Sequence, residues 1–368
     1  AFNDAVIRLV NSLTSFAAII LTNKHLVIEM ENLFTAFSKL IASAIDKKSP
    51  YTGSHCRRVP EITMLLATAC HQIPHGPLAD FSMDEDDFHE LSVAAWLHDC
   101  GKVATPEYVM DKSKKLETIF DRIELVNARF EIAARDITYS TKLNDKEKLA
   151  QLKALAKDRE FIANANTGGE FFDDDKIERV YKIAKHYQIV IDGNKQSVIN
   201  DDEVLNLITK RGTLTSKERQ IINDHMKVTV EMLESMPFPK HLQNVPEFAC
   251  GHHEKMDGTG YPKGLKRDEM SVQARIMAIA DIFEALTASD RPYKEPKTLS
   301  ETLKIMGHMK LDDHIDPDLF DVFVEQKVYL TFAQQFLQEN LIGRMGQTNS
   351  CAVNIPFSCD SPTDRFTP

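Results

Sequence analysis

The chain has 368 residues, of which 43% are hydrophobic and 27% charged, a composition typical of a folded protein with one large or two ordinary domains. Its net charge of -11 argues against binding of polymeric nucleic acid through a broad basic face, although a small anionic ligand held by a metal and a few cations fits it. The six cysteines form no C-x-x-C pair and four lie in apolar segments, which indicates reduced thiols rather than a disulfide framework.

The start of the chain offers little evidence of targeting. No uninterrupted apolar run approaches the length of a membrane span, and the longest near the start is Phe16 to Leu21. No signal peptide with a basic leader is present. Because the first residue is Ala rather than Met, we expect a piece of a larger protein whose upstream sensor or membrane anchor is missing, and a cytoplasmic location for the piece itself.

The segment from about Asp4 to Asp46 contains no Pro or Gly and is predicted to be helical throughout. Two apolar stripes with coiled-coil spacing follow it in different phases, with a stutter or short turn between Leu21 and His25. Two interpretations stay open: a dimeric signalling helix, or an ordinary amphipathic helix packed on its own domain. The stripes are Val6, Val10, Leu13, Ala17 and Ile20, then Leu26, Met30, Leu33, Phe37, Leu40 and Ala44.

After a turn at residues 48–53 the pattern predicts helices and no convincing alternating strand. Pro60 should bend its helix or limit the first turn. The acidic run 173–175 is interpreted as a helix N-cap rather than a metal site, and Thr215 with Glu218 resembles a helix start. The predicted helices span residues 54–71, 84–98, 115–166 (one or two helices), 173–187, 216–236, 272–288, 298–310 and 317–340, with a loop at 101–111 and a disordered tail at 343–368.

Histidine and aspartate residues recur in or beside apolar helices, where they are costly to bury without partners. Each one alone is better explained as a hydrogen-bonded core residue. Because five separate segments repeat the pattern, we predict a site for Fe, Mn, Zn or Ni, and the lack of a thiolate ligand argues against structural zinc. The predicted ligands are His55, His98, Asp99, His225, His252, His253 and Asp281.

Two further features lie next to these residues. A tight turn runs from Asp257 to Pro262 directly after His253, and its glycines allow close approach of the backbone to a ligand. Arg291 and Lys294 follow the helix of Asp281, where cations suit a phosphate. The alternative for these cations is that they only complete the helix dipole.

Taken in order, these segments resemble the HD-GYP family of cyclic dinucleotide phosphodiesterases, over about residues 35–112 and 210–330. The resemblance implies an all-α fold. An HD-domain helical bundle would occupy residues 49–342, with a long helical insertion at about 113–210. Residues 1–48 would form a coiled-coil-like signalling helix, loosely similar to the end of a GAF-type sensor. The matching segments are His55 to Val59, His98 to Lys102, Gly212 to Thr215 leading to His225, His252 to Pro262, Ala280-Asp281 and Asp290 to Lys294.

The resemblance also implies chemistry. Two divalent ions, Fe or Mn by family preference, would lower the pKa of a shared water, and cyclic di-GMP would be hydrolysed to a linear dinucleotide and then to GMP. Asp99 would bridge the two ions and Lys102 would lie against the scissile phosphate, which makes these two the expected catalytic residues. One ion would be held by His55, His98, Asp99 and Asp281, the other by His225, His252 and His253, and the substrate by Lys102, Arg291, Lys294 and Tyr261.

Partners and departures from the family pattern complete these expectations. A homodimer through the N-terminal helix and a GGDEF-type signalling partner at the Gly-Tyr-Pro loop are implied. Tyr51 stands where some members carry a Glu for a third metal, so two metals are expected. Glu284 replaces a common Asp, and a changed contact behind the ligands is expected. The insertion replaces a short link, and a lid, a dimer element and a regulatory subdomain all fit it.

Four other functions stay open at this stage. They are a non-catalytic cyclic dinucleotide receptor of the same fold, a phosphodiesterase specific for 3′,3′-cyclic GMP-AMP, an HD-type hydrolase of other nucleotides, and a purely structural helical module. The complete ligand set with Lys102 disfavours the receptor, and the paired His252-His253 with the Gly-Tyr-Pro loop disfavours other hydrolases. A structural module leaves the buried His and Asp residues unexplained.

Overall fold

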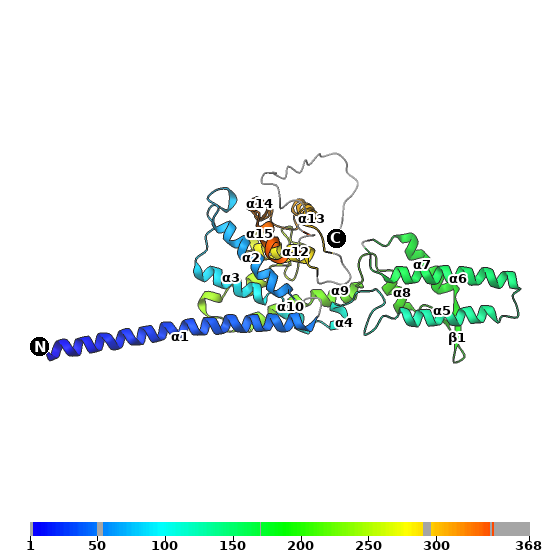
Figure 1. The fold of residues 1–368 in the computed structure, drawn as a ribbon, viewed down its shortest axis with the longest axis horizontal. Coiled ribbons are helices and arrows are strands. Elements are labelled where there is room, and N and C mark those ends of the chain that lie inside the picture. The colour runs from blue at the N-terminus through cyan, green and yellow to red at the C-terminus, as the bar shows by residue number, and fades with distance from the viewer. Residues whose placement is uncertain (1–2, 50–53, 170, 290–295, 339–340, 342–368) are drawn as a thin grey trace.

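The computed structural model describes residues 3–49, 54–169, 171–289, 296–338 and 341. Within these ranges nearly all regular structure is helical, which confirms the predicted all-α fold. Figure 1 shows a long helix, α1 (Asp4–Lys48), that runs along a central bundle and projects beyond it, with the insertion on the opposite side. The predicted tail, as well as Tyr51, Arg291 and Lys294, lies outside the described residues.

The central bundle combines segments from both sides of the insertion around one apolar core. The N-terminal segments are α2 (His55–His71), η1 (Gly76–Leu78), α3 (Glu85–Leu97), η2 (Cys100–Ala104) and α4 (Glu107–Met110). The C-terminal segments are α9 (Ser216–Asn223), α10 (His225–Glu234), η3 (Lys240–Leu242), α11 (Val245–Cys250), η4 (Arg267–Glu269), α12 (Val272–Thr287), α13 (Leu299–Leu311), α14 (Pro317–Glu325) and α15 (Val328–Phe336).

Several predicted boundaries of the bundle helices are wrong. The predicted loop at 101–111 contains the short helices η2 and α4. The single helix predicted at 216–236 is divided at Asp224, and the one predicted at 317–340 is interrupted before α15 by Lys327, whose φ of 54° lies outside the helical region. By contrast, the capping box of Thr215 and Glu218 at the start of α9 is present as predicted.

α1 is one uninterrupted helix, so of the two alternatives for residues 21–25 the short turn is wrong, whereas a stutter is compatible with the continuous helix. Its C-terminal part packs on the bundle through the buried Ala42 and Ile45 and the partly buried Phe34. The second predicted stripe faces away from the bundle, with Leu26 55% and Leu33 67% exposed. The interpretation of that stripe as a face packed on its own domain therefore fails.

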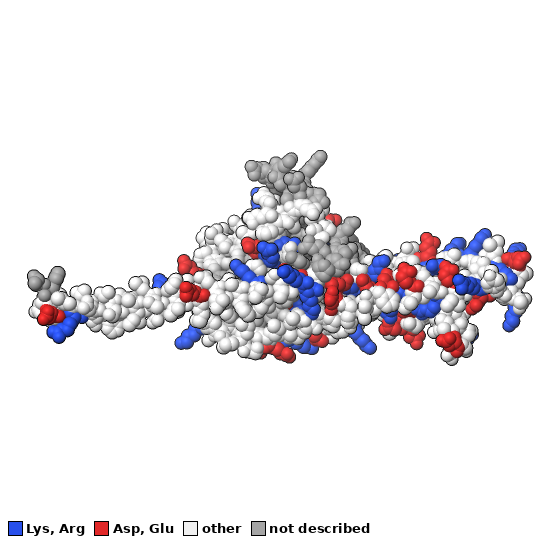
Figure 2. Space-filling model, turned by 60° about the horizontal axis from the view of Figure 1, so that its bottom comes forward, with Lys and Arg blue, Asp and Glu red and all other residues white. Residues whose placement is uncertain are grey.

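The N-terminal part of α1 exposes an apolar, almost uncharged surface, which appears white in Figure 2, whereas the insertion carries mixed charges. An 18-residue window of α1 has a mean hydropathy of 1.7, so by length and composition alone this helix could cross a membrane. Asn11 and Thr14 divide the apolar residues of α1, so the helix contains no uninterrupted apolar run of that length. One such helix near the N-terminus is weak evidence of a span, since signal sequences share these properties.

The insertion has an apolar core of its own, which includes Val126, Phe130, Ile162 and Val180. It also contains a hairpin that the sequence analysis missed. Positive φ angles at Asp192 and Gly193 form the turn, a pattern that the Asp-Gly pair favours between two strands. Its elements are α5 (Ile123–Thr138), α6 (Asp145–Asn166), α7 (Asp174–His186), β1 (Gln188–Ile191), antiparallel β2 (Asn194–Ser197) and α8 (Asp201–Leu207). Asp173 caps α7, as predicted for the acidic run.

The two chain crossings between bundle and insertion lie side by side. The Thr213 hydroxyl donates to the Lys112 carbonyl over 2.9 Å. The buried Lys112 ammonium donates to both carboxylate oxygens of Glu218 at 2.8 Å and to the amide oxygen of Asn206 at 2.7 Å. Because Asn206 lies in α8 and Glu218 in α9, Lys112 joins the end of the insertion to the part of the bundle that leads to His225.

Candidate metal centre

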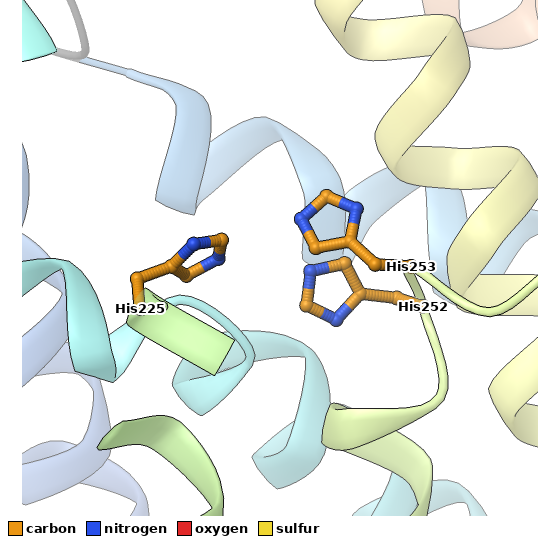
Figure 3. A group of neighbouring side chains, drawn as sticks. All are labelled: His225, His252 and His253. Atoms are coloured by element: carbon orange, nitrogen blue, oxygen red, sulfur yellow. The ribbon is translucent and has the colours of Figure 1, made fainter. Parts of the chain in front are cut away.

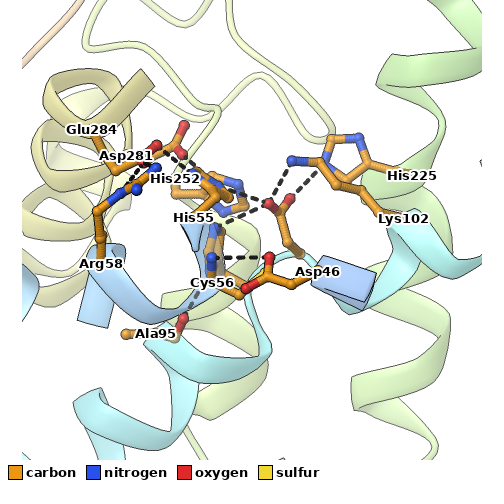
Figure 4. Close-up of polar contacts among 12 residues, drawn as sticks. Asp46, His55, Cys56, Arg58, Ala95, Lys102, His225, His252, Asp281 and Glu284 are labelled. Atoms are coloured by element: carbon orange, nitrogen blue, oxygen red, sulfur yellow. Dashed lines mark hydrogen bonds and ion pairs between the residues drawn. The ribbon is translucent and has the colours of Figure 1, made fainter. Parts of the chain in front are cut away.

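The predicted ligands come from five places in the bundle and meet in one cluster, parts of which are drawn in Figure 3 and Figure 4. His55 is the first residue of α2, and His98 with Asp99 follows the last residue of α3. The remaining positions are the start of α10 for His225, the turn after α11 for His252 and His253, and the interior of α12 for Asp281. Helix packing therefore brings together side chains that lie up to 226 positions apart in the chain.

The first group consists of His55, His98 and Asp99, whose potential ligand atoms all lie within 4.8 Å of one another. The Nε2 atoms of His55 and His98 lie 3.0 Å and 3.3 Å from Asp99 Oδ2. Asp281 joins this group, since its Oδ1 lies 3.4 Å from His55 Nε2.

The second group consists of His225, His252 and His253 and satisfies the same 4.8 Å limit (Figure 3). His225 Nε2 lies 3.3 Å from Asp99 Oδ1, the oxygen that the first group does not use. The two oxygens of one buried carboxylate thus face two groups of imidazoles. This is the geometry in which an aspartate bridges two cations.

Backbone carbonyls orient three of the histidines. The Nδ1 atoms of His98, His225 and His252 donate to the carbonyls of Ala95 at 2.8 Å, Ile222 at 2.5 Å and Ala249 at 2.5 Å. Each acceptor lies three residues earlier, where a helix ends and its last carbonyls need partners. With Nδ1 protonated, each Nε2 presents its lone pair to the cluster, as in proteins whose histidines bind metals.

The atoms that face the cluster fit a pair of cations. Among the described residues, the Nε2 atoms of His98, His225 and His252 and Oδ1 of Asp99 are buried and form no hydrogen bond. Buried polar atoms are rarely left in this state, because it costs roughly 1–3 kcal/mol for each of them. Imidazole nitrogens combined with carboxylate oxygens are the donor set of Fe, Mn, Ni and Zn.

The fourth imidazole, of His55, is oriented by a carboxylate instead of a carbonyl. Its Nδ1 lies 2.5 Å from Oε2 of the buried Glu284, whose other oxygen accepts from the Arg58 guanidinium. Burial lowers the pKa of His55, but Glu284 and Asp99 outweigh burial and raise the pKa to about 10. Burial raises the pKa of Glu284, whereas His55 and Arg58 bring it down to about 2. Glu284 is thus an ionised residue directly behind a predicted ligand.

The paired histidines are held neutral. Burial, followed by the proximity of His98, lowers the pKa of His252 to about 3. Burial and the neighbouring His252 and His225 hold the pKa of His253 well below its ordinary value. A neutral imidazole is the form that binds metals, so both side chains need no deprotonation at neutral pH.

Two of the predicted substrate-binding residues lie beside this cluster. The Lys102 ammonium lies 2.5 Å from Asp99 Oδ2, and its side chain is 20% exposed. Burial lowers the pKa of Lys102, but Asp99 and Asp281 raise it above its ordinary value, so the group is a cation. The Tyr261 ring stacks on His253 with ring centroids 4.9 Å apart. The other two, Arg291 and Lys294, belong to the residues that the structure does not describe.

Two contacts that shape the site were not predicted. The buried Glu254 accepts from the backbone amides of Lys263 at 2.7 Å, Gly264 at 3.1 Å and Leu265 at 2.9 Å, and so fixes the loop that contains Tyr261. The Gly101 amide donates to the Thr229 hydroxyl at 3.0 Å, which joins η2 to α10. Sequence alone offered one signal for the first contact, an acidic residue directly after two histidines, and none for the second.

Comparisons with known proteins agree with this geometry. Residues 201–319 match the model of the HD domain family, a stretch that includes His225, His252, His253 and Asp281. His55, His98 and Asp99 lie outside it, on the other side of the insertion. The chain thus contains a segment that matches the HD domain, and the packing of the bundle brings His55, His98 and Asp99 to the ligands of that segment.

Relatives in the curated proteins are more specific. The chain is 39% identical over 140 residues to a probable cyclic di-GMP phosphodiesterase of Vibrio cholerae, covering 36% of this chain and 31% of that protein. It is 41% identical over 125 residues to a cyclic di-GMP phosphodiesterase of Thermotoga maritima, covering 34% and 33%. A third relative, a 3′3′-cGAMP-specific phosphodiesterase of Vibrio cholerae, is 36% identical over 132 residues, covering 36% and 28%.

These matches confirm the predicted resemblance to the HD-GYP family of cyclic dinucleotide phosphodiesterases. The matched region spans about a third of the length of the curated relatives. Activity, substrate and partners of this protein are therefore matters of proposal.

Proposed function

We propose that this protein is a metal-dependent phosphodiesterase that hydrolyses a cyclic dinucleotide, with cyclic di-GMP as the first candidate substrate. One observation carries the proposal: the two oxygens of Asp99 face two groups of imidazoles, in which the inward nitrogens of His98, His225 and His252 have no hydrogen-bond partner among the described residues. Two divalent ions, Fe or Mn, would supply a water activated near neutral pH and neutralise charge on the phosphodiester.

The residues of the chain have separate roles in this proposal. His55, His98, Asp99 and Asp281 would hold one ion, and His225, His252 and His253 would hold the other, with Asp99 shared between the two groups. Lys102 is the catalytic cation. Because its side chain is 20% exposed, we propose that it turns from Asp99 to a non-bridging phosphoryl oxygen, where positive charge stabilises the transition state. Tyr261 borders the substrate pocket, and Arg291 and Lys294 bind phosphate oxygens.

A matched pair of variants tests the chemistry. Replacing both His98 and Asp99 by Ala removes ligands from both groups, so bound metal and hydrolysis should be lost together. The control is His89→Ala, because His89 lies in the same helix α3 but contacts Thr35 rather than the site. Metal is measured by elemental analysis and hydrolysis by chromatography of the products. Full hydrolysis by the double variant would exclude the proposed site.

The named relatives favour a second candidate substrate, 3′,3′-cyclic GMP-AMP, since the curated proteins similar to this chain include phosphodiesterases specific for it. Parallel assays of both dinucleotides with the metal-loaded protein decide between them. The products also show whether hydrolysis stops at the linear dinucleotide. Tight binding of a dinucleotide without any turnover, in protein with full metal content, would instead identify a receptor.

We further propose a homodimer through α1. The stripe that includes Leu26, Met30 and Leu33 is exposed along the helix, at the spacing of a coiled-coil seam. Burying one such leucine contributes about 1.5–3 kcal/mol, which gives a second copy a reason to pair there. Leu33→Glu should shift the protein to monomers in analytical ultracentrifugation, while a dimer that persists unchanged would contradict this assignment.

The remaining proposals concern the cellular setting. We propose a cytoplasmic location for the HD domain. The four cysteines among the described residues are free and buried, as is usual where thiols stay reduced. The loop around Tyr261 is proposed as the contact for a GGDEF-type signalling partner. The insertion, which has its own core and closes on neighbouring residues of the bundle, is proposed as a regulatory subdomain rather than a part of the active site.

A further inference from the structure

The last turn of α1 contacts two segments beside the first metal group. One is the start of α2, which contains His55, and the other is η2, which follows Asp99. The buried Asp46 accepts from the backbone amide of Cys56 at 3.3 Å, in the first turn of α2 and next to His55 (Figure 4). Ser54, the residue at the N-cap of α2, makes no capping bond with its side chain. The Asp46 carboxylate therefore acts as the acceptor that the start of α2 requires.

Lys48 binds the second segment, η2, which contains Lys102. Its ammonium donates to the backbone carbonyls of Lys102 at 3.2 Å, Val103 at 2.5 Å and Thr105 at 2.6 Å. A lysine has three N–H donors, so this contact uses all of them. The three carbonyls lie at the end of a short helix, where they need partners from outside the helix.

The contact of Lys48 with η2 bears on the position of the Lys102 side chain. η2 is only five residues long, Cys100–Ala104, and this one ammonium binds three carbonyls at its end, beside the bond from the Thr105 amide to the Lys102 carbonyl. A shift of the end of η2 moves the Lys102 side chain relative to Asp99, 2.5 Å away. Misplacement of a catalytic group by about 1 Å can lower a rate about 100-fold.

We propose that Lys48 is a positioning residue, through which α1 sets the place of the Lys102 ammonium in the site. The part of this proposal that concerns turnover rests on the proposed function. Since α1 projects beyond the bundle with an exposed apolar surface, an input that shifts or rotates the helix reaches Lys102 through three hydrogen bonds. The helix then regulates catalysis through the position of the Lys102 ammonium.

The test is a double-mutant cycle in the full, metal-loaded chain, with the variants Lys48→Met, Lys102→Met and the pair together. Lys48→Met alone should lower kcat by ~10-fold or more, and Lys48→Arg should restore part of it. If Lys48 acts through Lys102, the same change should lower kcat less than ~2-fold in the Lys102→Met background. Equal losses in both backgrounds, or no loss in either, would overturn the proposal. Lys47→Met is the matched control, since Lys47 is the exposed neighbour in the same helix.

A second measurement does not depend on activity. Amide hydrogen exchange of residues 100–105 should become faster in Lys48→Met and stay unchanged in Lys47→Met, while exchange in α13 is equal in all variants. Unchanged exchange at 100–105 in Lys48→Met refutes the positioning role whatever the enzyme does. Absence of turnover in the wild-type chain, with the expected change in exchange, would instead refute the proposed function and leave the positioning role standing.

Discussion

Gly101→Ala is the sharpest single change that the structure offers, because it acts on the contact between the two halves of the metal centre. A Cβ at Gly101 would lie 2.0 Å from the His225 carbonyl oxygen and 2.6 Å from both the amide nitrogen and the hydroxyl of Thr229. Ordinary contact begins at 3.4 Å, so η2 and the first turn of α10 must separate by about 1.4 Å. The His225 backbone is the group that must move, and its side chain moves with it.

The expected consequences are both structural and functional. Such overpacking costs about 1–3 kcal/mol of unfolding free energy. A shift of this size also exceeds the tolerance of about 0.2 Å in metal–ligand distances, so Asp99 and His225 could no longer share an ion as proposed. We expect a lower midpoint in urea denaturation, metal content reduced to one ion or none, and at least ~100-fold slower hydrolysis.

Gly307→Ala provides the control for this prediction. Gly307 lies inside α13, and a Cβ there meets nothing within 4 Å. The same substitution should therefore stabilise the protein by roughly 0.5–1 kcal/mol through helix propensity and leave the metal content unchanged. If Gly101→Ala retained the wild-type midpoint and two ions per chain, the inferred contact between η2 and α10 would be incorrect.

Two other predictions concern charges. Glu284→Gln should weaken metal binding at the first group by about 10–100-fold in chelator competition, because His55 loses the anion that orients it. Metal binding at the second group serves as the internal control. Equal metal affinities of the two groups in this variant would contradict the role of Glu284. Burial, followed by the proximity of Lys176, lowers the pKa of Lys115 to about 8. Between about pH 8 and about pH 10 the unfolded chain therefore binds more protons than the folded chain, so the unfolding free energy should rise with pH in that window. Urea titrations followed by circular dichroism measure this rise, and Lys115→Met should abolish it.

Local sequence was sufficient wherever a few neighbouring residues decide the structure. Helix starts at Thr215 and Asp173 follow from side chains that cap the next turn, and the all-α fold follows from helical periodicity. The residue types also predicted a metal site, because histidines and aspartates beside apolar helices are costly to bury without partners such as metal ions. The Asp192-Gly193 turn was readable too, although the hairpin was overlooked.

Only the tertiary structure decided which residues surround the ligands and in what orientation. The pairing of Glu284 with His55 joins positions 229 residues apart, and the contact of Lys48 with η2 joins positions 54 to 57 apart. Such contacts depend on how helices pack, which no local pattern encodes. The exposed stripe of α1 illustrates the same limit: its spacing fits burial against either the bundle or a second copy, and only the packing of Ala42 and Ile45 showed which face the bundle covers.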